Sequence, residues 1–311
     1  MGVTPPVSGI AGPVWLRRLG WASLLANVGI VLTGGAVRLT SSGLGCPTWP
    51  RCTDGSFTPH RALGYHQAIE FSNRTLTFVL TAVAIATLVS AWRSGRRDLR
   101  RLAIVLVLSI PAQAVLGGIT VLTDLNPWIV SLHLLVSLVI ISTAVLYLWR
   151  IERPAGSLEA QPSDEQPSPV LWLAWSTYAA AWVVLYLGTV VTGSGPHAGD
   201  VSAPRNGLDP RQISQLHADL VFLLIGLTLA LVLVVRVTPS TPGQRRTVSV
   251  LLGVELSQGV LGFVQYFTDL PIALVELHLL GAALVISSVT WMLLEVREGA
   301  PAKVPVAAGR G

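Results

Sequence analysis

Three histidines fall where the chain is otherwise apolar, each a few residues inside a long hydrophobic run. His133, His217 and His278 lie about four, five and seven residues into their runs. At 1.5 Å of helical rise per residue, all three would lie roughly 6–11 Å from the same end of the apolar region. Ligand-type side chains inside a membrane are costly and usually face the interior of a helix bundle. The shared depth therefore predicts a shared kind of site.

Two imidazoles on facing helices are the usual way for a four-helix bundle to hold haem iron. Zinc and copper sites normally recruit more than two His, Cys or carboxylate ligands, and the sequence has no His-x-x-x-His or Cys-x-x-Cys pattern. We therefore interpret His217 and His278 as axial ligands of one haem iron. For a single histidine, a satisfied structural hydrogen bond would explain its presence equally well.

The stretch HQAIEFSNR, residues 66–74, places further polar groups on one helical stripe. Asn73 occupies the position that corresponds to His217 in the other half of the chain, and a carboxamide is a poor iron ligand. The site of His133 should therefore have one strong ligand and a second position that is weak, open or filled differently. That arrangement suits a substrate that must arrive and leave. His66 is either the missing ligand or an interfacial residue at the helix start.

Glu70 and Arg74 lie on the same stretch. A carboxylate in the first turns of a helix gains from the helix dipole, which is a sufficient structural reason for Glu70. On the stripe of Asn73, however, it would face the substrate and could transfer protons or stabilise developing positive charge. We expect this catalytic role. Arg74 is interpreted as a contact to a haem propionate or as an ordinary interfacial arginine.

The elements that position these residues must be membrane-spanning helices. The 311 residues are 51% hydrophobic and 12% charged, and the mean hydropathy of +0.63 is far above that of a water-soluble domain. A span needs about 20 apolar residues. The fold is predicted to be an all-α integral membrane protein with eight transmembrane helices. The predicted spans are 19–39, 68–92, 102–122, 129–149, 169–193, 212–236, 247–267 and 271–294.

The basic residues orient these spans. Short cytoplasmic loops collect Lys and Arg, and with both termini cytoplasmic, 15 of the 21 Lys and Arg residues fall on the inner side. The first run follows Arg17 and Arg18 and lacks a small-residue cleavage site, so we expect it to be retained as a span. We expect a multi-pass protein of the plasma membrane with its histidines near the extracytoplasmic side. Because the loops explain the basic pI of 9.8, nucleic-acid binding is not expected.

The chain is an internal repeat. The segment QAVLGGITVLTDLNPWIVSLHLL at 113–135 matches QGVLGFVQYFTDLPIALVELHLL at 258–280 with a constant offset of 145, and LTGG at 32–35 is echoed by VTGS at 191–194. Internal similarity of this length indicates a duplicated unit. We therefore expect two four-helix bundles related by a pseudo-two-fold axis. The repeated Gln113 and Gln258 are interpreted as polar contacts of a pocket or as helix–helix hydrogen bonds.

The duplication divides the chain into three parts. Residues 1–150 form the predicted N-terminal bundle with the substrate site, and residues 169–311 form the C-terminal bundle with a fixed haem. The intervening segment 151–168 is rich in Pro, Ser and acidic residues and lacks an apolar face, so we expect a flexible cytoplasmic linker.

The only two cysteines, Cys46 and Cys52, lie in the outer loop GLGCPTWPRC. Two loop cysteines this close can form a disulfide on the oxidising side of a bacterial-type membrane. All 309 other positions avoid cysteine, which makes two unrelated thiols the weaker explanation. We expect a disulfide bond.

Together these features resemble the haem A synthase family. The resemblance covers nearly the whole chain and rests on GLGCPTWPRC, on IEFSNR at the start of the second span, on LHLL around His133 and His278, and on the duplicated eight-helix plan. It implies oxidation of the C8 methyl of haem O to the formyl group of haem A by successive hydroxylations, for the assembly of aa3-type cytochrome oxidase. It also implies haem b on His217 and His278, haem O in the first half, Glu70 at the catalytic acidic position, and the outer-loop disulfide of some members.

The sequence departs from that family at Asn73, where a histidine is common, so simple two-histidine ligation of the substrate is in doubt. The expected partners are haem O, haem O synthase, cytochrome oxidase assembly factors and membrane lipid, and a homo-oligomer is left open. The main alternative is a non-catalytic membrane b-type cytochrome that carries electrons from quinol, which would predict two bis-histidine haems. A transporter would place its polar residues near the midplane, whereas these lie near the outer surface.

Overall fold

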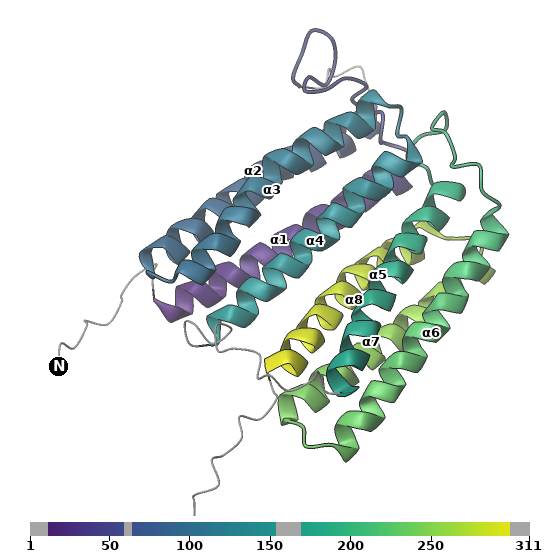
Figure 1. The fold of residues 1–311 in the computed structure, drawn as a ribbon. Helices are drawn as coiled ribbons and strands as arrows, with labels where there is room; N and C mark the ends of the chain where they lie inside the picture. The colour runs from purple at the N-terminus through teal and green to yellow at the C-terminus, as the bar shows by residue number, and fades with distance from the viewer. Residues whose placement is uncertain (1–11, 59–63, 154–168, 299–311) are drawn as a thin grey trace, which may run out of the picture.

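The computed structural model describes residues 12–58, 64–153 and 169–298 (Figure 1). The described residues contain eight long helices that are apolar enough to cross a membrane. They are α1 (Pro13–Leu39), α2 (Tyr65–Arg93), α3 (Arg97–Leu122), α4 (Pro127–Ile151), α5 (Pro169–Ser194), α6 (Pro210–Val237), α7 (Pro242–Phe267) and α8 (Ile272–Glu298). The protein is therefore an all-α, multi-pass membrane protein, as the sequence predicted.

Several helices extend past the predicted spans at the ends that carry basic residues. Helix α1 begins at Pro13 instead of residue 19, α3 at Arg97 instead of residue 102, and α7 at Pro242 instead of residue 247. Arginine is a good helix former, and its long side chain can reach water from a turn at the membrane interface. The helix therefore continues after the apolar run has ended.

Side-chain caps fix the N-terminal ends of α4 and α6. The Oδ1 atom of Asn126 accepts a hydrogen bond from the N–H of Trp128 at 3.0 Å, and the Oδ1 atom of Asp209 accepts two from the first turn of α6. Each helix then begins with proline, whose missing N–H would have had no helical partner. These caps set the depth at which His133 and His217 enter the bundles.

The helices pack as two groups of four, which Figure 1 shows side by side. In the first group α1 and α3 each contact both α2 and α4; in the second, α5 and α7 each contact both α6 and α8. Helix α4 contacts α5 and α8, and α1 contacts α8, across the boundary between the groups. This packing agrees with the two expected four-helix bundles. The pseudo-two-fold relation and the domain limits remain predictions, and most of the predicted linker, residues 154–168, lies outside the described residues.

The largest buried apolar cluster lies where the two bundles meet. Ile141 and Ala144 of α4 and Ile286 and Val289 of α8 are fully buried members of it. Close van der Waals packing is a main favourable term when membrane-spanning helices associate. The cluster thus fixes the two bundles against each other, whereas the three histidines are only partly buried.

Candidate functional site

The three predicted histidines lie at matching depth. His133, His217 and His278 follow the first residues of α4, α6 and α8 by six, seven and six positions, or about 9–10 Å along each helix. Because consecutive helices run in opposite directions, these three even-numbered helices all start at the same end of the molecule. The shared depth expected from the sequence is therefore present.

Each of the three rings lies against a glycine of the preceding helix. The three contacts join Gly117 to His133, Gly188 to His217 and Gly262 to His278, and a Cβ atom at each glycine would lie 3.4, 3.4 and 3.5 Å from the Cε1 atom of its ring. Glycine, which lacks a Cβ atom, lets each imidazole pack this closely against the neighbouring helix. The same contact at three places in both halves indicates a repeated site.

Asn73 of α2 occupies the fourth position of this pattern. By the offset that relates LTGG to VTGS, the glycine of α1 that corresponds to Gly188 is Gly29. A Cβ atom at Gly29 would meet nothing within 4 Å. The Oδ1 atom of Asn73 accepts a hydrogen bond from the Oγ1 atom of Thr33 at 2.7 Å. The carboxamide is thus held against α1, and the space beside Gly29 is open.

The histidine rings keep unused hydrogen-bonding capacity. The Nδ1 atoms of His133, His217 and His278 are buried without a hydrogen-bond partner, although buried polar atoms are nearly always bonded. His217 and His278 lie on α6 and α8, two helices of the same four-helix group. Two imidazoles at one depth in one bundle could together hold a haem iron, whereas His133 with Asn73 offers one strong ligand.

Gln113 secures the helix turn that carries His133. Its Nε2 atom donates to the carbonyl of His133 at 3.2 Å and to the Oγ atom of Ser137 at 2.6 Å. The helix–helix hydrogen bond is therefore present for Gln113. Gln258 instead lies so close to Gly281 of α8 that any Cβ atom there would overlap its side chain. The second glutamine is used for close helix packing.

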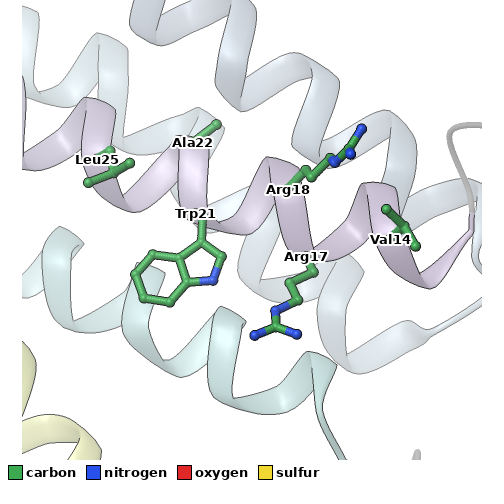
Figure 2. A pocket seen from close by; sticks show the side chains of 6 residues that line it. All are labelled: Val14, Arg17, Arg18, Trp21, Ala22 and Leu25. Atoms are coloured by element: carbon green, nitrogen blue, oxygen red, sulfur yellow. The ribbon is translucent and has the colours of Figure 1, made fainter.

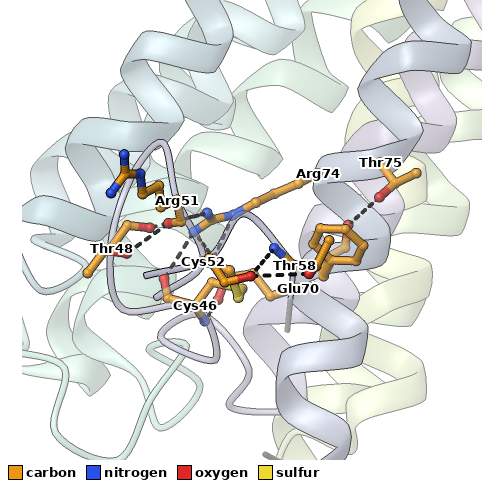
Figure 3. Close-up of a disulfide and its surroundings, with 10 residues drawn as sticks. Cys46, Thr48, Arg51, Cys52, Thr58, Glu70, Arg74 and Thr75 are labelled. Atoms are coloured by element: carbon orange, nitrogen blue, oxygen red, sulfur yellow. Dashed lines mark hydrogen bonds and ion pairs between the residues drawn. A yellow bond between two sulfur atoms is a disulfide. The ribbon is translucent and has the colours of Figure 1, made fainter. Parts of the chain in front are cut away.

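Cys46 and Cys52 form the disulfide bond that the sequence predicted (Figure 3). Both cysteines are fully buried. The loop that they close folds back onto the first turns of α2, because side chains of α2 form hydrogen bonds with the loop backbone.

Glu70 binds this loop directly. Its carboxylate is 5% exposed, its Oε2 atom accepts the N–H of Cys46 at 2.6 Å, and its Oε1 atom accepts from the Nη2 and Nε atoms of Arg74 at 2.5 and 3.1 Å. A charged, hydrogen-bonded carboxylate with an arginine beside it is a stable buried arrangement. The contacts give Glu70 a structural role that differs from the expected interaction with the helix dipole, since α2 has no acidic residue in its first turn. Its catalytic role stays a prediction.

Arg74 also donates hydrogen bonds to the backbone of the loop. Its guanidinium donates to the carbonyls of Cys46, Thr48 and Arg51 at 3.0, 3.2 and 3.3 Å (Figure 3). The sequence did not indicate this role, because the three carbonyls become neighbours of Arg74 only when the loop folds back. A contact from Arg74 to a haem propionate remains a prediction that competes with these bonds.

His66 is the second residue of α2. Its Nδ1 atom lies 2.9 Å from the Oγ atom of Ser42, which belongs to the loop after α1. The residue therefore lies at the helix start and contacts a loop, which matches the interfacial interpretation. Its role as an iron ligand remains untested.

Trp49 is a part of the site that the sequence reasoning did not single out. Its ring covers Gly118 of α3 so closely that a Cβ atom there would lie 2.4 Å from the Cδ2 atom of the tryptophan. The disulfide loop therefore packs against α3 as well as α2. The signal was the Gly-Gly pair in VLGGIT, since a glycine inside a helix often marks a close approach.

Two hollows open on the surface of α1. One, of about 370 Å³, lies between α1 and α2, and Thr33, Ser72 and Asn73 are among its lining residues. It therefore reaches the carboxamide at the fourth position. The other, of about 510 Å³, lies along the opposite end of α1 beside Arg17, Arg18 and Trp21 (Figure 2), and contains none of the predicted site residues.

Comparisons with known proteins agree with this arrangement. Residues 17–201, more than half of the chain, match a family model described as cytochrome oxidase assembly protein. The chain is similar to proteins named heme A synthase from Lysinibacillus sphaericus (35% identity over 187 residues, covering 56% of this chain and 58% of the relative) and Staphylococcus haemolyticus (28% over 181 residues, 56% and 59%). A third, from Staphylococcus epidermidis, is 26% identical over 212 residues, covering 64% and 69%. The match thus spans less than two thirds of the first two relatives.

Proposed function

The chain belongs to the cytochrome oxidase assembly protein family, and on this basis we propose that it is a haem A synthase. The proposed reaction oxidises the C8 methyl of haem O to the formyl group of haem A by successive hydroxylations, for the assembly of aa3-type cytochrome oxidase. One observation carries the proposal: three imidazoles lie at one depth, each against a helix glycine, and Asn73 takes the fourth position. Relatives that bear the name heme A synthase support it.

In the second bundle, His217 and His278 would hold haem b. Their matching depth in one bundle and the glycines beside their rings support this assignment. When bound, haem b supplies a centre that accepts and releases one electron at a time. The protein's contribution is to hold both imidazoles on helices whose positions are fixed by the buried cluster between the bundles.

In the first bundle, His133 would hold the iron of the substrate haem O. Gln113 supports this role by fixing the backbone turn that carries the ring. The corresponding residue on α2 is Asn73, which has only a carboxamide. Its oxygen already accepts a hydrogen bond from Thr33. A substrate with one strong ligand can enter and leave, as haem O and haem A must.

Glu70 would act one helical turn from Asn73. Cys46 and Arg74 hold its carboxylate in place with three hydrogen bonds. A fixed carboxylate can stabilise positive charge that develops on the methyl carbon as it is oxidised. It can also accept a proton that this carbon releases. The disulfide loop would therefore position the catalytic group.

The orientation and partners follow from the same proposal. The basic helix ends support cytoplasmic termini in the plasma membrane, and the disulfide supports an extracytoplasmic position for the site. Haem O synthase would supply the substrate, and cytochrome oxidase assembly factors would receive the product. Whether copies of the chain assemble into a homo-oligomer can be measured on the same purified sample.

The test is to express the protein with a supply of haem O and separate the extracted haems by chromatography. We expect haem A, its hydroxylated intermediate, or both. If haem O stays unchanged while the protein retains a b-type spectrum, the enzyme proposal is wrong, and a non-catalytic b-type cytochrome is the better description. His217→Ala and His278→Ala should each lose the b-type spectrum.

A further inference from the structure

Glu255 of α7 is a buried carboxylate that the proposed mechanism does not use. It is 2% exposed. Its Oε1 atom accepts a hydrogen bond from the Oγ1 atom of Thr228 in α6 at 2.9 Å, and its Oε2 atom is buried without a partner. An ionisable side chain inside a membrane span is costly and is a functional candidate for that reason. The unpartnered oxygen adds to that cost.

Its depth relates it to the second haem site. Glu255 precedes Gly262 by seven residues, about 10 Å along α7, and Gly262 lies against the ring of His278. Thr228 follows His217 by eleven residues on α6, about 16 Å. The carboxylate therefore lies in the same bundle as the proposed haem b site, displaced toward the other side of the membrane.

The internal repeat shows that packing does not require this pair. The offset of 145 places Ile110 where the second half has Glu255, and the offset of 144 places Ala84 where it has Thr228. The equivalent positions of the first bundle thus carry apolar residues. The polar pair is confined to the bundle that would carry the fixed electron-transferring haem.

Other charges lie toward the helix ends. Helix α7 packs against α6 and α8. Their charged or titratable side chains up to residue 297, with those of α7 itself, are Arg211, His217, Asp219, Arg236, Arg245, Arg246, Tyr266, Glu276, His278, Glu295 and Arg297. On α6 the nearest charged residue to Thr228 is Arg236, eight residues away. On α7 the nearest to Glu255 is Arg246, nine residues away, so both lie about 12 Å or more along the helix axis. The imidazole pair lies toward the outer end, and Glu295 and Arg297 lie near the inner end of α8.

We infer that Glu255 is a proton acceptor coupled to the electron held between His217 and His278. The inference rests on the proposed function, which places haem b there. If haem b held by His217 and His278 gained one electron, the Glu255 carboxylate would bind one proton from the solvent at Oε2 and become the neutral acid. When the electron leaves, the proton returns to water. The net charge of the bundle interior then stays constant, which matters because charges interact strongly in an apolar medium. The electron comes from substrate oxidation in the enzyme and from an electrode in the test.

The test is a redox titration of the b-type spectrum in the purified full-length protein, repeated over a series of pH values. We expect the midpoint potential of the wild type to fall with rising pH over part of the range, and that of Glu255→Gln to be flat there. Gln keeps the size of Glu and an oxygen that can accept from Thr228. Redox-difference infrared spectra should show a carboxylic acid C=O band that Glu255→Gln loses.

Two control variants separate this role from a structural one. Thr228→Val removes the hydrogen bond but keeps the carboxylate, so it should keep the pH dependence. Glu295→Gln changes a carboxylate at the inner end of α8, outside the proposed coupling, and should also keep it. If Glu255→Gln retains the wild-type slope and infrared band, the inference is wrong. Should Glu255→Gln fail to bind haem, Glu255→Asp, which keeps the acid, must retain the slope, and a flat response from it would overturn the inference.

The haem A assay is measured separately on the same preparations. A wild-type protein that shows the coupled protonation but forms no haem A would overturn the proposed synthase activity while supporting the role of Glu255. A protein that forms haem A but shows no pH dependence of the midpoint potential would support the synthase activity and overturn the role of Glu255.

Discussion

Glu70 fastens the disulfide loop and is also the proposed catalytic carboxylate, and substitution can separate these roles. In Glu70→Gln, the amide oxygen can still accept the N–H of Cys46, but the ion pair with Arg74 is lost. We expect a loss of about 1–3 kcal/mol in stability, measured by thermal unfolding in detergent. Conversion of haem O should fall about 100-fold or more, the usual contribution of a positioned acid or base.

Arg74→Lys is the matched control for that prediction. Lysine keeps the positive charge beside Glu70 but cannot reach the loop carbonyls with the same fork of donors. It should lower the stability by a similar amount and leave most of the conversion. If both variants lose conversion in proportion to stability, Glu70 acts only by holding the loop.

Asn73 decides the ligation of the substrate iron. Asn73→His would place an imidazole beside Gly29, where a Cβ atom meets nothing within 4 Å, in the manner of His217 beside Gly188. We expect a second bis-imidazole haem spectrum and slower release of haem A, because two strong nitrogen ligands would hold the iron. The absorption spectrum with haem O bound reports the change. Thr33→Val frees Asn73 without adding a ligand and should leave the spectrum unaltered; an unchanged spectrum in Asn73→His would contradict the assigned geometry.

The residue types could be predicted from the sequence, whereas their partners could not. The depth of His133 and His278 follows from where the apolar runs begin, and the repeat exposes Asn73 as the odd member. The bonds of Glu70 involve the backbone of Cys46, 24 residues earlier. Periodicity along a helix carries no information on a loop that folds back over it, so this contact had to come from the structure.

The disulfide loop docks as a unit on α2 and α3, and Gly118 is the contact on α3 that sequence and structure share. In Gly118→Ala, the added Cβ would lie 2.4 Å from the rigid ring of Trp49, so the ring must move. We expect destabilisation of about 1–3 kcal/mol and faster proteolysis within the loop, followed by mass spectrometry. Gly226→Ala in α6 is the control, since its Cβ would meet nothing within 4 Å and alanine favours the helix. Equal proteolysis of both variants would show that Trp49 does not anchor the loop.

At the level of helices, hydropathy predicted where each span crosses the membrane but not how far the helix continues. Helix α3 gains its first turn at Arg97, and Arg96 joins that turn to the end of α4 through hydrogen bonds to the carbonyls of Arg150 and Arg153 at 2.8 and 2.9 Å. Such charged turns leave the apolar run, so a search for apolar segments ends before them. They join neighbouring helices at the membrane surface.

The whole molecule is held together at both ends as well as by its central apolar cluster. At the outer end, Arg38 of α1 donates to the carbonyls of His197 and Thr192 at 2.6 and 2.8 Å. At the other end, Arg153 forms an ion pair with Glu295 of α8 at 2.6 Å. Both sets of contacts cross from one half of the chain to the other. Electrons from the proposed substrate oxidation in the first bundle would pass to haem b in the second. This transfer needs a fixed separation between the two sites.

These contacts predict that the two halves associate without a covalent link. We expect two polypeptides, produced together from a chain interrupted between residues 154 and 168, to copurify and to retain the b-type spectrum, because side chains of α4, α5 and α8 pack closely in one cluster between them. Arg38→Met should weaken the association about tenfold or more, since one hydrogen bond to a charged group contributes about 1.5–3 kcal/mol. Arg51→Met, whose wild-type side chain bonds the carbonyl of Asp54 in its own loop, should not. Halves that fold and bind haem separately but do not copurify would show that the linker, and not the interface, joins the bundles.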